Sequence, residues 1–276
     1  EKLAAGLLRL AEEDPTFVTQ KDPETRQTLV YSMGEIHLQH NLGKLERKYG
    51  TKARVVEPKV PYRETILGKA EGEGKHKKQS GGHGQYGHVF LRVEPTTEDF
   101  EFVDDIFGGA VPRQYIPAVE KGARETLAKG MIAGYPMIGV RVTLYDGSYH
   151  SVDSSEMAFK VAASLALRKI IPQAQPILLQ PVYNVNVFVP DEYMGAIVGD
   201  LSAKGGRILG MEPGERGGES VVRAQVALGK MFSYVTELRS QTQGRGTFNM
   251  EFYQYEQVPF QEAQEIIDAY TAEKEE

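Results

Sequence analysis

The stretch Y-D-G-S-Y-H-S-V-D-S-S-E-M-A-F, at residues 145–159, decides how the middle of this chain is built. It follows an alternation of apolar residues at 140, 142 and 144, a pattern that predicts a β-strand. The dipeptide Asp146-Gly147 is typical of a tight turn, so the sequence predicts that the strand ends there.

The second half of this stretch has the pattern of a helix start. Asp153 predicts a helix N-cap, and Glu156 three residues later predicts its capping-box partner. The residues between strand and helix, 146–152, form a short polar loop that exposes His150. A loop held at both ends by regular elements can present a side chain to a partner, although the same residues also suit an ordinary helix start.

A second loop accompanies the first. Residues 80–88 read S-G-G-H-G-Q-Y-G-H and lie between predicted strands at 74–80 and 86–94. The glycines are typical of a hairpin loop. A hairpin loop and a functional tip need the same construction, so both interpretations stay open from the residues alone.

The composition is that of a soluble globular protein. The 276 residues predict about one to three domains, and 41% are hydrophobic and 25% charged. The absence of cysteine excludes disulfides, thiolate zinc sites and cysteine nucleophiles, and it agrees with a reducing cytoplasm. No apolar run reaches the roughly 18 residues of a membrane span, and no signal peptide opens the chain, so we expect a cytoplasmic protein without a membrane partner.

The formal net charge of −6 argues against broad, non-specific binding to nucleic acid. It still permits a local basic surface. Because the chain begins at Glu1, directly within a helical pattern, we expect it to be a fragment of something longer.

The two ends of the chain share one order of elements. The last third predicts a strand at 182–189, a helix at 191–203, strands at 207–211 and 220–227, a helix around 231–238, and a strand at 247–253. This is the ferredoxin-like split βαβ order. The first segment predicts a helix, a hairpin, a helix at 34–49 closed by Gly50, and a strand at 51–56, which is the same order without its first strand.

The middle of the chain has a different organisation. We expect strands at 74–80, 86–94, 100–106 and 136–145, and helices at 114–129 and 154–170. On the second helix one face contains Ala158, Val161, Ala162 and Leu165, and its small residues would let it lie close to a sheet. A short amphipathic helix is expected at 261–270.

No catalytic or metal-binding motif is evident. The glycines at 81–87 lack the Lys-Ser/Thr that completes a phosphate loop, and no G-x-S-x-G elbow is present. His37 and His40 are three residues apart on a helix but have no third ligand, so we expect no metal site. A hydrolase built from His150, Asp153 and Ser154 would compete with the capping role of Asp153, and we expect no catalytic residues.

Contact with RNA has more support. Lys75, His76, Lys77 and Lys78 lead into the glycine-rich loop and place positive charge beside backbone amides that glycine leaves exposed. RNA-binding proteins use such groups on phosphates and 2′-hydroxyls, and stack bases on histidine or tyrosine. A basic strand edge that discourages aggregation explains the same charges, so both interpretations stay open.

Several longer motifs occur together and in order. They are R-L-A-E-E-D-P-T-F at 9–17, M-G-E-I-H-L at 33–38, S-G-G-H-G-Q-Y-G-H at 80–88, Y-I-P-A-V-E-K-G at 115–122, the stretch at 145–159, G-D-L-S-A-K-G-G-R-I-L-G-M-E at 199–212, and L-R-S-Q-T-Q-G-R-G-T-F at 238–248. With these motifs the chain resembles bacterial elongation factor G over essentially its whole length. The resemblance is to domains three, four and five, without the GTP-binding domain and domain two.

The resemblance implies an α+β, multidomain fold. Two ferredoxin-like split βαβ domains, at 1–60 (first strand missing) and 178–276 (with a C-terminal helix), would flank an elongated domain at 61–177. That middle domain would be a βαβ domain with a left-handed crossover, like domain 2 of ribosomal protein S5.

The resemblance also implies a function: GTP-dependent translocation of tRNA and mRNA by a ribosome-dependent GTPase. Domain four would reach the decoding region of the small subunit, and domains three and five would contact the factor site of the large subunit. GTP and magnesium would belong to the missing N-terminal domain in cis, leaving no cofactor in this piece. The tip residues implied are Gly81, Gly82, His83, Gly84, Gln85, Asp146, Gly147, Ser148, Tyr149 and His150, with basic support from Lys75, Lys77 and Lys78. His150 matches the family's tip histidine.

The chain departs from the family pattern at two places. His83 stands where the family usually has arginine, which replaces a permanent charge by a group that is mostly neutral at pH 7. Lys204-Gly205-Gly206 replaces the family's R-R-G and removes more positive charge. These changes keep an alternative open, an elongation factor G-like regulator or rescue factor that binds ribosomes or RNA without moving tRNA.

Overall fold

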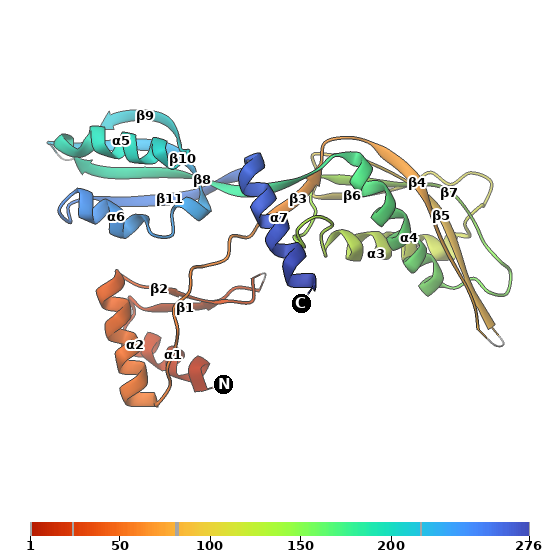
Figure 1. The fold of residues 1–276 in the computed structure, drawn as a ribbon, viewed down its shortest axis with the longest axis horizontal. Helices are drawn as coiled ribbons and strands as arrows, with labels where there is room; N and C mark the ends of the chain where they lie inside the picture. The colour runs from red at the N-terminus through yellow and green to blue at the C-terminus, as the bar shows by residue number, and fades with distance from the viewer. Residues whose placement is uncertain (1, 24, 81–82, 216, 276) are drawn as a thin grey trace. The chain divides into compact units, whose positions relative to one another are not determined.

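The computed structural model describes residues 2–23, 25–80, 83–215 and 217–275, which form two compact units (Figure 1). The first unit comprises Glu1–Pro61 and Pro181–Tyr255, and the second comprises Tyr62–Gln180 and Glu256–Glu276. Within the described residues no helix has the length and apolar character needed to cross a bilayer.

The N-terminal part of the first unit packs two helices on a small hairpin. Its elements are α1 (Lys2–Glu13), β1 (Val18–Lys21), β2 (Thr28–Tyr31) and α2 (Glu35–Tyr49). Leu7, Leu10, Phe17 and Leu45 are buried together between them. Gly50 ends α2 in the left-handed conformation, with φ of 61°, which confirms the predicted C-cap.

The strand predicted at 51–56 is wrong. Residues 50–62 have no strand pairing, and β1 and β2 form a two-stranded sheet. In the ferredoxin-like order the last strand pairs with the first, and no strand precedes α1 in the described residues. The segment has strand-like composition but no neighbouring strand to satisfy its backbone groups.

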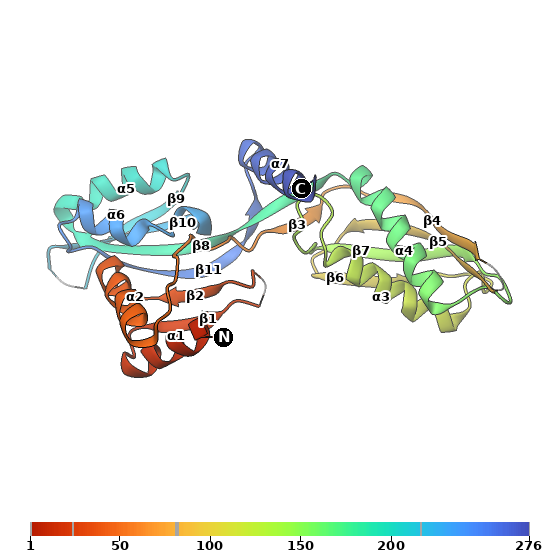
Figure 2. The same ribbon diagram turned by 60° about the horizontal axis from the view of Figure 1, so that its bottom comes forward.

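The C-terminal part of the first unit has the predicted ferredoxin-like topology. Its elements are most of β8 (Pro176–Pro190), α5 (Met194–Ala203), β9 (Arg207–Pro213), β10 (Glu219–Ala227), α6 (Tyr234–Gln241) and most of β11 (Thr247–Gln257), with short 3₁₀ turns at Asp191–Tyr193 and Leu228–Lys230. The strand order β11-β8-β10-β9 is that of a split βαβ sheet. Both helices pack on one face of the sheet around a shared apolar core (Figure 2).

The second unit is built on a four-stranded sheet. Its strands are β4 (Ala70–Ser80), β5 (His83–Pro95), β6 (Phe100–Asp104) and β7 (Val140–Ser148), in the order β4-β5-β7-β6. The remaining elements are β3 (Arg63–Ile66), α3 (Ile116–Leu127), α4 (Glu156–Ile170), α7 (Phe260–Glu275) and the 3₁₀ turns Arg113–Tyr115 and Ile171–Ala174. Since β6 and β7 are parallel neighbours and α3 lies between them in the chain, they form the expected βαβ unit. The hand of this crossover stays a prediction.

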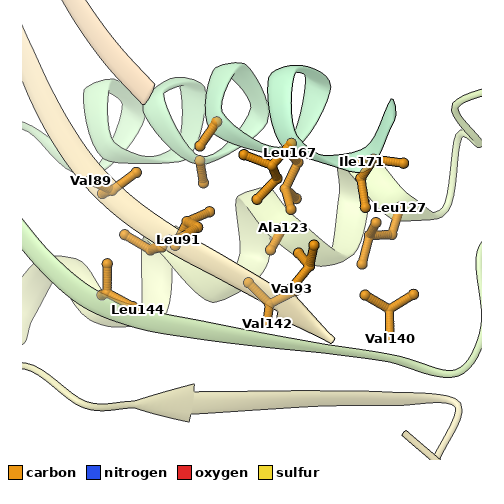
Figure 3. Packing of buried hydrophobic residues seen from close by; sticks show 14 of the residues in the cluster. Val89, Leu91, Val93, Ala123, Leu127, Val140, Val142, Leu144, Leu167 and Ile171 are labelled. Atoms are coloured by element: carbon orange, nitrogen blue, oxygen red, sulfur yellow. The ribbon is translucent and has the colours of Figure 1, made fainter. Parts of the chain in front are cut away.

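The core of this unit lies between the sheet and two helices. Figure 3 shows side chains of β5 and β7 pointing toward α3 and α4, and each labelled residue is buried. The labelled residues are Val89, Leu91, Val93, Ala123, Leu127, Val140, Val142, Leu144, Leu167 and Ile171. Alternate residues of each strand face this core, so the other face of the sheet carries the polar side chains.

Glycines on the core face let α4 lie directly on the sheet. A Cβ at Gly74 would be 2.0 Å from the backbone oxygen of Ala162, and a Cβ at Gly87 would be 2.5 Å from the backbone of Ala158. The close approach predicted for this helix is therefore confirmed. Its buried face differs from the prediction, because Val161 and Leu165 are only half-buried. The fully buried residues of α4 are Ala158, Phe159, Ala162, Ala163, Ala166, Leu167 and Ile170.

The turn predicted at Asp146-Gly147 is also wrong, because both residues belong to β7. The register between β5 and β7 shifts at Phe90, which lets β7 continue to Ser148. A Cβ at Gly147 would be 2.5 Å from the carbonyl oxygen of His88 and equally close to Val111. This glycine is needed for close packing within the sheet.

Glu64 on β3 is a buried carboxylate that the sequence did not reveal. Its side chain is fully buried and accepts hydrogen bonds of 2.5–3.1 Å from four backbone N–H groups, those of Met131, Ile132, Ala133 and Tyr135. These bonds fix the loop that follows α3. The loop in turn packs with Leu178, Val258 and residues of α7, so Glu64 organises the surface on which the C-terminal helix lies.

Candidate functional site

The two segments singled out in the sequence meet at one end of the four-stranded sheet. The N–H of Gly84 donates to Oδ1 of Asp153 at 3.1 Å, and the N–H of Tyr86 donates to the Asp153 carbonyl at 2.8 Å. Tyr86 and Ser154 also form an isolated parallel bridge. We call Gly84, Tyr86, Ser148, His150, Asp153 and Ser154 the tip cluster. Through Asp153, the β4–β5 hairpin and the loop before α4 form one structure.

Asp153 is not the helix N-cap, so that prediction was wrong. Ser155 has the extended N-cap conformation, and its hydroxyl accepts the N–H of Ala158 at 3.2 Å. Because Ser155 supplies the cap, the capping box with Glu156 does not form. The carboxylate of Asp153 is then available to hold the hairpin.

His150 is fixed by backbone bonds on one side and exposed on the other. Its Nδ1 accepts the N–H groups of Val152 at 3.3 Å and Asp153 at 3.2 Å. The backbone N–H of His150 donates to Oγ of Ser154 at 2.9 Å, and the backbone carbonyl of His150 accepts the Ser154 N–H at 3.2 Å. The side chain is 53% exposed, so the loop presents the imidazole to solvent.

A chain of polar contacts supports the cluster from the open face of the sheet. Oγ of Ser148 lies 2.8 Å from the Tyr86 hydroxyl and 2.9 Å from Nδ1 of His88. Nε2 of His88 lies 2.7 Å from Glu73, and this hydrogen bond lowers the pKa of the Glu73 carboxyl. The Tyr86 ring lies 6.3 Å from the His150 ring, centroid to centroid.

The three predicted basic residues are exposed, but they do not share one face. Lys75 pairs with His88 and Lys77 with Tyr86 across the hairpin, so both lysines extend from the open face. Nζ of Lys75 lies 5.7 Å from the centre of the Tyr86 ring, within cation–π range. Lys78, the next residue along β4, extends from the opposite face.

The remaining predicted residues lie around this cluster. Gln85 is exposed, and its side-chain oxygen lies 2.8 Å from Nε2 of His76. Tyr149 is 52% exposed and follows directly after β7. His83 begins β5. Gly81 and Gly82 lie outside the described residues.

The cluster has the chemistry of a recognition surface. Oγ of Ser154 accepts the backbone N–H of His150, and Nδ1 of the imidazole is occupied by backbone donors, so these residues do not form a nucleophile–base pair. In the described ranges no three His, Asp or Glu side chains are grouped to hold a metal ion. The cluster exposes the imidazole of His150, and its neighbours Tyr149, Gln85 and Lys75 add phenol, amide and ammonium groups, all of which suit hydrogen bonding or stacking.

Sequence reasoning missed the residues that join the two segments. Asp153 and Tyr86 were both within the quoted motifs, but they are far apart in the chain and no local pattern connects them. The available signal was the D-S-S run, since two serines following the aspartate offer the helix an alternative cap.

Lys204, at one of the two places where the chain departs from the family pattern, lies within a cluster of ion pairs. Nζ of Lys204 contacts Asp200 at 3.3 Å and also binds Glu237. The hydrogen bond to Glu237 raises the pKa of the lysine, and the same contact lowers the pKa of Glu237. This ammonium group is therefore already paired within the protein.

Three family profiles together match nearly all of the chain. Elongation Factor G, domain III matches residues 1–57; Elongation factor G, domain IV matches 58–175; and Elongation factor G C-terminus matches 177–266. A protein of Thermus thermophilus with a solved crystal structure is 44% identical, with a TM-score of 0.88 over 98% of this chain. The chain spans 40% of the length of that protein. On these matches, the chain belongs to the elongation factor G family and consists of that family's domains III, IV and C-terminal domain.

Proposed function

We propose that this chain is the ribosome-binding half of a translation elongation factor that promotes GTP-dependent translocation of tRNA and mRNA in the cytoplasm. The observation that carries the proposal is the junction at Asp153, which holds the exposed imidazole of His150 beside the glycine-rich hairpin. Membership of the elongation factor G family supplies the context.

In this proposal the tip cluster and its neighbours contact the small-subunit decoding region, where tRNA and mRNA lie. His150, Tyr149 and the 81–85 loop supply hydrogen bonds, a stacking surface and backbone amides, together with the end of β7 at Asp146-Gly147-Ser148. Lys75, Lys77 and Lys78 supply the charge that attracts phosphates. No bond is made or broken by this piece, because its role is recognition and mechanical displacement.

The flanking parts would have a different role. We propose that 1–60 and 178–276 act as domains that precede and follow the tip-bearing domain, 61–177, in the chain, and that they contact the factor site of the large subunit. A GTP-binding domain in cis would hold GTP and magnesium. The family profiles change near residues 57 and 176, close to these boundaries, which supports the division.

The test is a substitution at His150 in the full-length product of the gene that encodes this chain. His150→Ala removes the exposed ring and is expected to slow translocation in a stopped-flow assay by about tenfold or more, the effect of losing one strong contact in the transition state. Ribosome-stimulated GTP hydrolysis should stay within about twofold of wild type, since in this proposal a separate domain binds the nucleotide.

Glu98→Ala is the control, because it removes an exposed side chain that follows the end of β5 opposite the tip cluster. It should leave both rates unchanged. Unchanged translocation in His150→Ala would refute the proposed role of the tip.

A second candidate is supported by the two departures from the family pattern. His83 reduces the charge at the hairpin, and Lys204 is paired with Asp200 and Glu237. A factor with fewer available cations could bind ribosomes as a regulator or rescue factor without moving tRNA. The same assay separates the two, because this candidate binds ribosomes but gives no translocation in the wild-type protein.

A further inference from the structure

We infer that His150 presents a fixed hydrogen-bond donor, its Nε2–H, so that the tip recognises an acceptor atom on RNA, and that Asp153 positions this donor. The inference rests on the proposed function for the identity of the partner. Its basis in the protein is the hydrogen-bond pattern around one imidazole ring.

The backbone determines which ring nitrogen carries the proton. Nδ1 of His150 accepts two N–H groups, from Val152 and Asp153. A nitrogen that accepts an N–H bond through its lone pair carries no hydrogen in the neutral ring, so the hydrogen is on Nε2. Val152 and Asp153 follow closely in the same loop, so the loop itself selects this tautomer.

The carboxylate of Asp153 does not change this outcome. Its Oδ2 lies 3.3 Å from Nδ1 and would accept a hydrogen bond from Nδ1 if the ring became protonated. In that imidazolium form Nε2 also carries a hydrogen. The nitrogen that faces away from the loop is therefore a donor in both of these forms, and it can pair with phosphate oxygens, 2′-hydroxyl oxygens or base acceptors but not with a base amino group.

Asp153 fixes the position of the His150 ring relative to the hairpin through four of its groups. Its N–H binds Nδ1 of His150, its carbonyl accepts the Tyr86 N–H, its Oδ1 accepts the Gly84 N–H, and its Oδ2 lies beside Nδ1. Its carboxyl is only 25% exposed although it lies next to an exposed ring. This makes Asp153 a positioning residue, because it acts through His150 and the hairpin and needs no contact with RNA of its own.

The tautomer can be measured directly in this chain. Nitrogen-15 NMR of the His150 ring, at a pH where the ring is neutral, should give a pyridine-type signal for Nδ1 and a pyrrole-type signal for Nε2. The reverse assignment would overturn the inference.

The positioning role is tested by two variants of Asp153. Asp153→Asn keeps an acceptor oxygen for the Gly84 N–H, whereas Asp153→Ala removes it. Hydrogen exchange of the Gly84 amide should rise about tenfold in the alanine variant and stay near wild type in the asparagine variant. Equal exchange in wild type and Asp153→Ala would show that the carboxylate does not hold the hairpin.

The donor role is tested on the ribosome with histidine methylated at Nε2, incorporated at position 150 of the full-length product. This methyl group removes the donor but leaves Nδ1 free to accept its two backbone bonds. Translocation should slow as much as in His150→Ala, about tenfold or more. The same methylated residue in place of the exposed Glu98, which follows the end of β5 opposite the tip, is the control and should have no effect.

The results separate the inference from the proposed function. If His150→Ala slows translocation but the Nε2-methylated ring does not, the donor inference is overturned while the tip role stands. If neither change slows translocation, the tip role itself is wrong.

Discussion

Replacing Glu64 by glutamine tests whether one buried carboxylate holds the base of the second unit together. The side chain is fully buried, and each carboxylate oxygen accepts two backbone N–H bonds. Burying a charge costs free energy unless the charge is fully hydrogen-bonded. The four N–H donors therefore offset the cost of burying the Glu64 carboxylate on the core side of β3.

The magnitude follows from the bonds that glutamine cannot make. Glutamine keeps one carbonyl oxygen, which serves one pair of donors, and it turns an NH₂ group toward the other pair. Bonds to a charged acceptor contribute about 1.5–3 kcal/mol each, so the loss of two predicts a destabilisation of the second unit by about 4 kcal/mol.

Hydrogen exchange is the appropriate assay, because a chain with two compact units need not unfold in one step. The amides of Ala133 and Tyr135 should exchange about a thousandfold faster in Glu64→Gln. The control is Glu71→Gln, which breaks an exposed pair with Arg92 and should change stability by less than about 0.5 kcal/mol. A loss of less than about 1 kcal/mol in Glu64→Gln would refute the reasoning.

Two further perturbations test the packing and the charge clusters. Gly74→Ala places a Cβ 2.0 Å from the backbone of α4, whereas Gly72→Ala places one 2.8 Å from a single side-chain methyl group, Cγ2 of Ile170. Hydrogen exchange of amides in the second unit should therefore show a loss of about 3 kcal/mol for the first variant and clearly less for the second, and equal losses would contradict the close-packing argument. Hydrogen bonds from Lys44, Lys48 and Tyr49 lower the pKa of Glu13 from 4.5 to about 2. Because the pKa of this carboxyl is lower in the folded state than in the unfolded state, its ionised form stabilises the fold at pH values above the unfolded-state pKa. This contribution should be lost as the pH falls from 4.5 through about 2. A carbon-13 NMR titration of Glu13 with a midpoint near 4.5 would contradict this.

The fold could be predicted from sequence wherever local pattern and neighbours agreed. The strand and helix order of the last third is confirmed, because each element has its periodicity and its partner strand in the same segment. The segment at 51–56 has the pattern of a strand but no partner strand, and the sequence pattern of one segment does not show whether a partner strand exists. β3 was missed because its four residues have no hairpin turn beside them and pair with β8, which lies far along the chain.

The sequence predicted which residues lie at the candidate site, but it did not predict the contacts that hold them together. The exposed position of His150 and its proximity to the hairpin agree with the sequence interpretation. Asp153 was assigned to a helix cap because capping is a local rule, whereas its actual contact with Gly84 is a tertiary one. The same limit explains Asp146-Gly147, where a long-range register shift keeps a turn-forming dipeptide in a strand.

The central claim is that His150 and the β4–β5 hairpin approach the same place on the ribosome, and directed hydroxyl-radical probing tests it most directly. The chain has no cysteine, so Gln85→Cys and Ser151→Cys each give a single attachment site for tethered iron. With the 276-residue chain bound to ribosomes, both sites should cleave overlapping nucleotides of the small-subunit decoding region, and Lys52→Cys should not. Cleavage in separate regions, or none near the decoding centre, would contradict the account.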